Sequence, residues 1–180
     1  MLIGDYEVYA PHILGGNANE TEMLGAATWL WMQSPLHQNA PLIALSTLLL
    51  PVIKAEQYVL VAHNGQPVFY LSYAFFDEEN EHRYLTQDDN ARLYQQVNSG
   101  NRLWFLEWMT PFGHSRDMAN LLRREIFPYH CYRALYHKGS ERGGARVLQF
   151  RGRGVSRQQA AHWWHDHPLT HEFPARDSSR

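Results

Sequence analysis

His37 lies in a short link between two apolar runs, where a rigidly held imidazole could do acid–base chemistry. The first run, 26–32, ends before Pro35, because the residue before a proline is pushed out of the α region. The second run, 42–52, begins after Pro41, and proline is favoured at the start of a helix. An imidazole titrates near neutral pH, so His37 is a candidate general base. A packing or capping role is the alternative that its position leaves open.

Glu107 is the second candidate, because the residues around it are nearly all large and apolar over a predicted strand, 102–109. A carboxylate in such surroundings is costly unless it is paired. Side chains alternate along a strand, so we expect one face to carry Leu103, Phe105, Glu107 and Met109. If Glu107 has a histidine partner, it is a catalytic candidate. If it lies at a strand edge, it gives no indication of function. The local sequence leaves both interpretations open.

Length and composition indicate one soluble globular domain. The chain has 180 residues, 44% of them hydrophobic and 19% charged. Its longest apolar stretch, 42–53, falls short of the ~20 residues that span a bilayer. The first twenty residues hold no Lys or Arg, unlike a secretory signal. A single cysteine, Cys131, excludes an internal disulfide and fits a reducing compartment, so we expect a cytoplasmic protein.

Charge is unevenly distributed along the chain. Residues 1–112 hold 4 Lys+Arg and 12 Asp+Glu, a balance of −8, and residues 113–180 hold 12 and 6, a balance of +6. Arginine clusters favour phosphates and acidic partners, although an ordinary solvated face is an equal alternative. The residues considered for such a surface are Arg116, Arg123, Arg124, Arg146, Arg151 and Arg153.

The pattern of apolar runs and turn signals predicts a mixed sheet with helices packed on it. Residues 1–20 are expected to be a loosely attached arm, 21–170 the folded domain, and 171–180 a flexible tail. Asn64-Gly65 predicts a hairpin, and Ser115 is a plausible N-cap. The expected helices are 20–33, 42–56 with a bend at Pro51, 116–126 and 156–165, and a short polar helix or loop is expected from 77. The expected strands are 58–62, 67–76, 102–109, 131–137 and 146–150, the last two joined by a turn at 139–144.

Two other groups of reactive residues carry less weight. Cys131 could be a thioester nucleophile, but a lone strand cysteine is more often packed and inert. His162, His165 and His167 lack a consistent metal-ligand spacing and a cysteine partner, so we expect no metal site. A coenzyme A-dependent acetyltransferase would need a glycine-rich loop after the 102–109 strand, and 110–116 offers only Gly113.

Several short motifs occur in one order that resembles the RTX toxin-activating lysine acyltransferases, the family that activates hemolysin-type protoxins. The resemblance covers about residues 25–150, with the first twenty or so residues as an extension. The motifs are Ala27-Thr28-Trp29-Leu30-Trp31, Ser34-Pro35-Leu36-His37, Gln57-Tyr58, Ser99-Gly100-Asn101-Arg102, Trp104-Phe105-Leu106-Glu107-Trp108 and Pro111-Phe112-Gly113.

This resemblance implies a fold, an activity and partners. The implied fold is similar to the GCN5-related N-acyltransferases: one α/β domain with a mixed central sheet flanked by helices. The implied enzyme transfers a fatty acyl group from acyl carrier protein to internal lysines of an RTX protoxin. The donor is a phosphopantetheine thioester, with no bound cofactor. Neither a nucleic-acid partner nor stable membrane insertion is expected, and the family suggests a homodimer.

The resemblance also assigns site residues. The family's catalytic histidine falls on His37, and the serine of the same motif falls on Ser34, a candidate oxyanion donor. The family's catalytic aspartate falls on Glu107, which keeps the carboxylate but adds one methylene. Asn101 likewise stands where the family has aspartate. Acyl carrier protein is acidic, so the six arginines above become its predicted docking surface.

A non-catalytic module is the alternative from another class. Such a protein would bind acyl carrier protein or the toxin through a degenerate site, and Glu107 in place of aspartate is its main support. Turnover by the wild type that His37→Ala abolishes would distinguish the enzyme from the module. A covalent acyl-histidine route stays open beside general-base catalysis.

Overall fold

The fold is built on one mixed β-sheet. The structure, a computed structural model, describes residues 1–86, 93–136 and 146–171. Neighbouring strands are antiparallel except β5 and β6, which are parallel and are linked through a helix. This confirms the expected α/β architecture. In sheet order the strands of the described residues are β1 (Leu2–Ile3), β2 (Tyr6–Tyr9), β3 (Tyr58–His63), β4 (Gln66–Phe76), β5 (Arg102–Met109), β6 (Cys131–Tyr136) and β7 (Arg146–Arg151).

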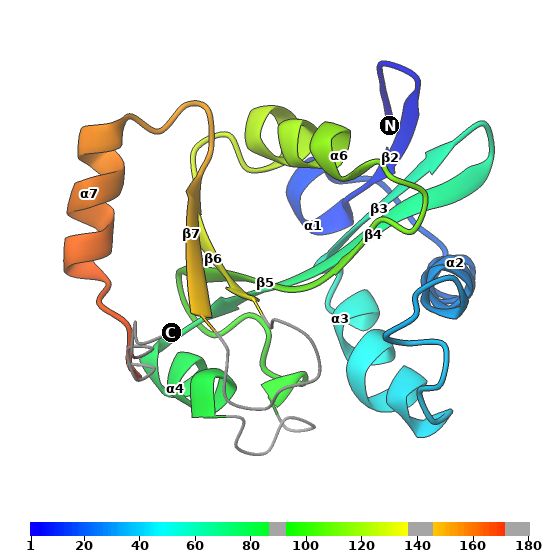
Figure 1. The fold of residues 1–180 in the computed structure, drawn as a ribbon, viewed down its shortest axis with the longest axis horizontal. Helices are drawn as coiled ribbons and strands as arrows, with labels where there is room; N and C mark the ends of the chain where they lie inside the picture. The colour runs from blue at the N-terminus through cyan, green and yellow to red at the C-terminus, as the bar shows by residue number, and fades with distance from the viewer. Residues whose placement is uncertain (87–92, 137–145, 172–180) are drawn as a thin grey trace, which may run out of the picture.

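Helices cover both faces of the sheet, as Figure 1 shows. One face carries α1 (Pro11–Leu14) and α6 (Ser115–Leu121), which continues as the π-helical turn η2 (Leu122–Ile126). The second face carries α2 (Glu20–Met32), the π-helical turn η1 (Leu45–Leu49), α3 (Leu50–Lys54) and α4 (Glu78–Thr86). α7 (Arg157–Asp166) packs beside the last two strands, where its Ala160 meets Cys131.

The N-terminal segment differs from expectation. β2 pairs with β3 in antiparallel register, with Val8 opposite Val61. Val8 and Ala10 are buried in the core under α6. Residues 2–9 are therefore part of the sheet rather than a loosely attached arm. Pairing of β2 with a strand about fifty residues away is a tertiary event that the local sequence does not indicate.

The hairpin between β3 and β4 forms as expected. Asn64 and Gly65 both have positive φ angles, 52° and 76°, which is the backbone conformation of a type I′ turn. His63 then faces Gln66 across the turn. This turn sets the register of β3 and β4 next to it, and a bulge between Val61 and Ala62 shifts the register by one residue farther along.

A β-bulge in β5 changes which face Glu107 occupies. Ser72 of β4 lies opposite Glu107, but the next residue, Tyr73, lies opposite Phe105, so Leu106 is an extra residue. An extra residue breaks the alternation of side chains. The expectation that Glu107 shares a face with Leu103 and Phe105 was therefore wrong: those two join the core under α6, while Glu107 turns toward α2.

The second helix is shorter and less regular than expected. Its first part is the π-helical turn η1, in which the Leu50 N–H donates to the Leu45 carbonyl, and α3 follows. Pro51 has no N–H and so cannot continue the i to i−4 ladder. The irregularity that Pro51 suggested is present, as a π-helical turn just before it.

Two further helix boundaries can be compared with the sequence. α7 begins after Ser156, whose hydroxyl accepts from the Gln159 N–H in a capping box. Ser115 is not an N-cap, because α6 begins at this residue and its Oγ bonds instead to Thr110 Oγ1 at 2.5 Å. The expected turn at 139–144 and most of the expected tail lie outside the described residues.

Candidate active site

The loop after α2 holds His37 in consecutive turns. The Ser34 carbonyl accepts from the His37 N–H at 3.0 Å and from the Gln38 N–H at 2.9 Å. The His37 carbonyl in turn accepts from the Ala40 N–H at 2.8 Å. These bonds use the backbone donor of His37 itself, so that N–H is not available to a substrate oxyanion.

The imidazole of His37 is held on two sides. Its Nδ1 lies 2.9 Å from Ser34 Oγ, and its ring lies against the indole of Trp31 with centroids 5.0 Å apart. The His37 side chain keeps 26% of its surface exposed, which leaves it reachable from solvent. Partial burial lowers the pKa of His37, so the neutral imidazole predominates at neutral pH.

Glu107 approaches the other ring nitrogen. Its Oε1 lies 3.9 Å from His37 Nε2, close enough for electrostatic attraction but longer than a hydrogen bond. The Glu107 side chain is only 10% exposed. Burial raises the pKa of Glu107 to about 7, because it penalises the charged carboxylate. The structure thus brings together His37 and Ser34, from the loop after α2, and Glu107, from β5.

Two residues that the sequence analysis did not single out lie beside this carboxylate. Ser72, opposite Glu107 on β4, and the indole of Trp31 both lower the pKa of Glu107. Ser72 Oγ, Trp31 Nε1 and Glu107 Oε2 are all buried without a hydrogen-bond partner among the described residues. Small movements would pair them. Trp31 lay within a recognised motif, but the opposition of Ser72 and Glu107 depends on the bulge.

The arrangement can accept a proton at one defined atom. With Glu107 ionised, the favoured tautomer of His37 carries its proton on Nε2, facing the carboxylate. The lone pair then sits on Nδ1, where it accepts from Ser34 Oγ. A base that becomes an imidazolium would be stabilised by the Glu107 charge. The geometry is that of a histidine–carboxylate pair with its basic nitrogen on the Ser34 side.

The six predicted docking arginines do not form one cluster. Arg123 Nε donates to the Arg151 carbonyl, and the Arg153 N–H donates to the Arg123 carbonyl, so these three meet where η2 approaches the end of β7. Arg124 follows on η2 and is exposed, as is Arg116 at the start of α6. Arg146 lies at the opposite end of β7, over the ring of Tyr136.

A buried ionic cluster accounts for another recognised motif. Glu81 of α4 is fully buried between Arg102 and Arg133, at 3.1 and 2.9 Å, and accepts from Trp104 Nε1 at 2.8 Å. The Thr170 N–H also donates to Glu81, which secures the chain after α7. Arg102, in the Ser-Gly-Asn-Arg motif, is therefore a structural residue. The sequence analysis did not identify the pairing.

Gly100 of the same motif is required by close packing. A Cβ added there would lie 2.5 Å from the Phe76 carbonyl oxygen and 2.6 Å from the Asp77 nitrogen, well inside contact distance. The Ser99 hydroxyl accepts from the Asp77 N–H at 3.0 Å. This turn therefore joins the end of β4 to the start of β5, and so helps to set the register that places Glu107.

The residues considered for other chemistry are engaged separately. His162 pairs with Asp166 on the surface of α7, and His167 stacks on Trp163. Burial raises the pKa of Cys131, which disfavours a thiolate nucleophile. In the part of the chain that the structure describes, no three His, Cys, Asp or Glu side chains are grouped as metal ligands. No helix in that part is long and apolar enough to cross a bilayer.

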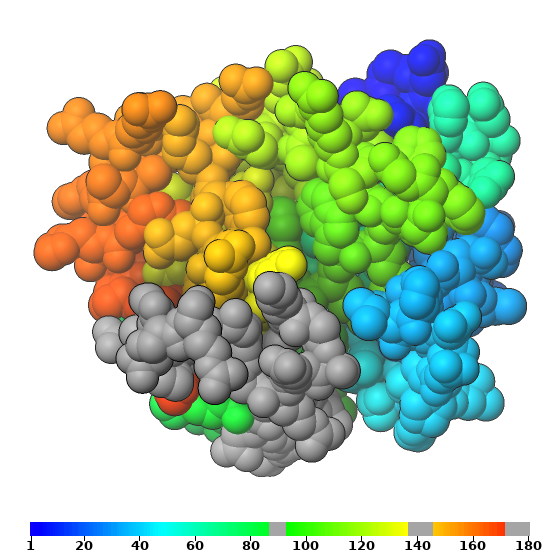
Figure 2. Space-filling model, viewed as in Figure 1, coloured from blue at the N-terminus to red at the C-terminus, as the bar shows by residue number. Residues whose placement is uncertain are grey.

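β5 and β6 separate along part of their length. Figure 2 shows a hollow between the yellow-to-orange residues of β7 and the green residues that follow β5. β5 and β6 pair only through 103–105 and 132–134, so β5 continues toward Glu107 without β6 beside it. The sheet is therefore split near the histidine–carboxylate pair.

Comparison with known proteins identifies the family. The model of the RTX toxin acyltransferase (HlyC) family matches residues 16–151. The leukotoxin-activating lysine-acyltransferase LtxC of Aggregatibacter actinomycetemcomitans is 40% identical over 143 residues, which cover 79% of this chain and 83% of the relative. The protein-lysine myristoyltransferase HlyC of Escherichia coli is 37% identical over 139 residues, 77% of this chain and 80% of the relative. With His37 and Glu107 both inside the matched region, the chain belongs to the RTX toxin acyltransferase family.

Proposed function

We propose that this protein transfers a fatty acyl group from acyl carrier protein to internal lysines of an RTX-type protoxin. Membership of the family supports acyl transfer to lysine, since the relatives are named toxin-activating lysine acyltransferases and protein-lysine myristoyltransferases. The observation that carries the catalytic assignment is the placement of His37 between Glu107 and Ser34. In this proposal His37 is the general base and Glu107 supports it.

A protonated lysine loses two protons on its way to an amide: the first goes to solvent and leaves the neutral amine, and the second is removed as that amine attacks. A lysine amine, with an unperturbed pKa near ~10.4, is mostly protonated at neutral pH and cannot attack. His37 Nδ1 accepts a proton as the amine nitrogen attacks the thioester carbonyl carbon. The new C–N bond forms, the C–S bond breaks, and the imidazolium returns its proton to the departing thiolate. Glu107 stabilises the imidazolium between these two events.

Ser34 is better suited to proton transfer than to oxyanion binding. Its single hydroxyl proton points to His37 Nδ1 whenever that nitrogen is the acceptor, and one proton serves one acceptor. We therefore assign Ser34 a role in proton transfer. Its hydroxyl either passes the amine proton to His37 Nδ1 or moves away so that the amine bonds to Nδ1 directly. Ser34→Ala should then reduce turnover less than His37→Ala.

Acyl carrier protein is the proposed donor, and an arginine surface is its proposed docking site. Arg123, Arg124, Arg151 and Arg153 gather where η2 meets the end of β7, and Arg124 and Arg153 are exposed there. An acidic carrier protein would be attracted to this surface. A cytoplasmic location follows from such a donor, and a homodimer remains a prediction from the family.

The first experiment is an intact-mass assay of a protoxin fragment. The fragment is incubated with this protein and acyl carrier protein that bears one defined fatty acyl chain. The expected result is an acyl-sized mass gain on lysine that is absent with His37→Ala. His114→Ala is the matched control, since that histidine lies near Tyr6 and His63 and not near Glu107.

One observation favours the non-catalytic module. The 3.9 Å between His37 Nε2 and Glu107 Oε1 is too long for a hydrogen bond, as expected if the site were degenerate. In that case no mass gain would appear with any chain length, while acyl carrier protein or the protoxin would still bind. Equal mass gain from wild type and His37→Ala would reject His37 as the base.

A further inference from the structure

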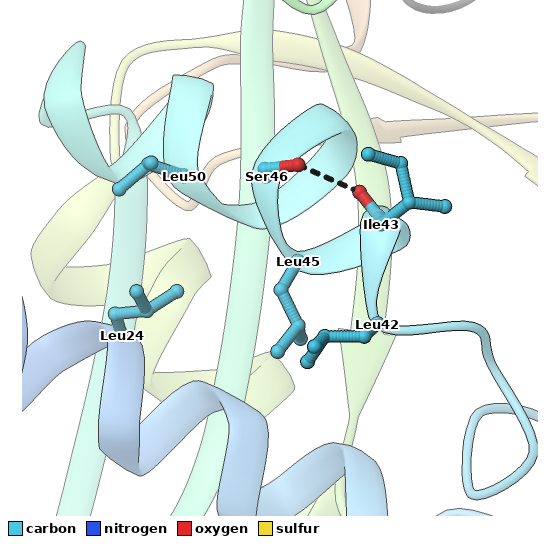
Figure 3. Close-up of a pocket in the computed structure, with 6 residues that line it drawn as sticks. All are labelled: Leu24, Leu42, Ile43, Leu45, Ser46 and Leu50. Carbon is cyan, nitrogen blue, oxygen red and sulfur yellow. Dashed lines mark hydrogen bonds between the residues drawn. The ribbon is translucent and has the colours of Figure 1, made fainter.

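An apolar groove lies between α2 and the segment that leads into α3. Its volume is about 420 Å³, within the usual range of ligand pockets, and its walls are almost entirely apolar. Figure 3 shows Leu24 of α2 on one side of the space, with Leu42 and Leu45 on the other. The groove, called here the α2–α3 groove, is lined by Leu24, Leu42, Ile43, Leu45, Ser46 and Leu50.

The groove exposes side chains that would ordinarily be covered. Leu42 is 82% exposed and Ile43 is 65% exposed, although the next residue, Ala44, is buried. Leu42 and Ile43 line the same groove, so they belong to one contiguous apolar surface rather than to scattered exposed residues. The Ser46 hydroxyl does not offer a polar contact, because it donates to the Ile43 carbonyl at 2.9 Å. The occupant that fits such walls is apolar throughout.

The groove is connected to the catalytic pair by two routes. Leu42 follows the His37 loop directly in the chain. On α2, Leu24 and Trp31 are seven residues apart, so they share a helix face and lie about 10 Å apart along the axis. Trp31 packs against the ring of His37. The end of the groove at Leu24 therefore lies about 10 Å along α2 from the residue that packs on His37.

We propose that the α2–α3 groove holds the fatty acyl chain of the donor while its thioester carbonyl lies at His37. A saturated fatty chain reaches about half the thickness of a bilayer core, or about 15 Å, which spans this distance. A relative named as a myristoyltransferase uses a chain of this class. The inference rests on the proposed function for its choice of ligand, and it assigns the chain-length selectivity of that reaction to named residues.

Binding measured without turnover tests the groove separately from catalysis. The probes are N-acyl cysteamines with 4, 8 and 12 carbons, whose amide cannot transfer the acyl group, titrated into the full-length protein by calorimetry. Ser46→Trp fills the groove, and Leu42→Ser removes apolar surface from its exposed wall. Leu2→Ser is the matched control, because Leu2 is 70% exposed on β1, away from the groove.

For the wild type, affinity should rise with chain length, by up to about fourfold for each buried methylene. Both groove variants should lose at least tenfold in affinity for the 12-carbon probe and keep that for the 4-carbon probe, with Leu2→Ser unchanged. A thermal melt of each variant verifies folding. The assignment would be overturned if both groove variants kept the wild-type preference for long chains. It would also be overturned if Leu2→Ser lost that preference as much as the groove variants do.

Two further outcomes separate the groove from its alternatives. If the 12-carbon probe binds as expected but no acyl group is transferred in the mass assay, the groove assignment stands and the proposed catalysis fails. If Leu42→Ser instead converts a dimer to a monomer in light scattering, and probe binding is unaltered, the surface joins two copies of this chain and the acyl-chain assignment is wrong.

Discussion

His37 Nε2 and Glu107 Oε1 lie 3.9 Å apart, between a loop after α2 and the far side of a bulge in β5. At this separation the carboxylate acts on the imidazole through its charge and not through a formed hydrogen bond. Burial also reverses the order of their pKa values, because it lowers that of His37 from its ordinary 6.5 and raises that of Glu107 to about 7.

Glu107→Gln should lower the kcat of lysine acylation by about 10²- to 10³-fold, because the imidazolium loses its charge partner in a water-poor site. Glu107→Asp should retain more activity than Glu107→Gln, because it keeps the charge. Single-turnover acylation of the protoxin fragment, followed by mass, measures both. Equal rates for Glu107→Gln and wild type would remove Glu107 from the mechanism.

Thermal stability of Glu107→Gln should exceed that of the wild type more at pH 8 than at pH 5. The pKa of Glu107 is raised from its unfolded value of 4.5 to about 7, so the folded protein binds the proton more tightly. Stability from this group is therefore present below the unfolded pKa and is lost as pH rises to about 7. The loss is about 3 kcal/mol, and glutamine does not titrate. Melting curves at both pH values measure it, and a constant difference would contradict it.

Ser72→Ala should move the pH dependence of acylation to higher pH. Ser72 lowers the pKa of Glu107, so its removal leaves the carboxylate protonated up to a higher pH. The acidic limb of kcat/KM, expected near pH 7 in the wild type, should shift upward, and Trp31→Phe should act in the same direction. Ser99→Ala is the control, because its hydroxyl bonds to Asp77 and not to Glu107. A lower rate with an unmoved limb would mean a structural role only.

Charge reversal at Arg124 and Arg153 should raise KM for acyl carrier protein and leave transfer from a small acyl thioester unaltered. Both side chains are exposed beside the end of β7, so reversal repels an acidic partner without disturbing the core. Lys54→Glu, exposed at the end of α3, is the control. The effect should weaken with added salt. Unaltered KM in the double variant would exclude this docking surface.

Glu81→Ala should destabilise the fold by about 3–5 kcal/mol, because it leaves Arg102 and Arg133 buried without their shared partner. Denaturant unfolding measures the change. Glu79→Ala is the matched control on the same helix, since among the described residues Glu79 forms its ion pair with Arg83, at the surface. A loss below about 1 kcal/mol would mean that the cluster does not hold α4 and the chain after α7 to the sheet.

Much of the fold was determined by local sequence. The Asn64-Gly65 hairpin, the capping of α7 by Ser156 and the strand pattern from 58 onward all rest on turn and periodicity signals that act over a few residues. The N-terminal strands were missed for the opposite reason. Their pairing with β3 joins segments about fifty residues apart, and nothing local indicates it.

For the site, the sequence alone singled out His37 and Glu107, one by its place in a proline-bounded link and the other by its apolar surroundings, and the ordered motifs joined them to one family. Only the tertiary structure decided how they meet. The bulge at Leu106 reverses the alternation of β5 and turns Glu107 toward Trp31 and His37. A single inserted residue moves a side chain to the other face of a sheet, and strand pairing, not periodicity, determines where it occurs.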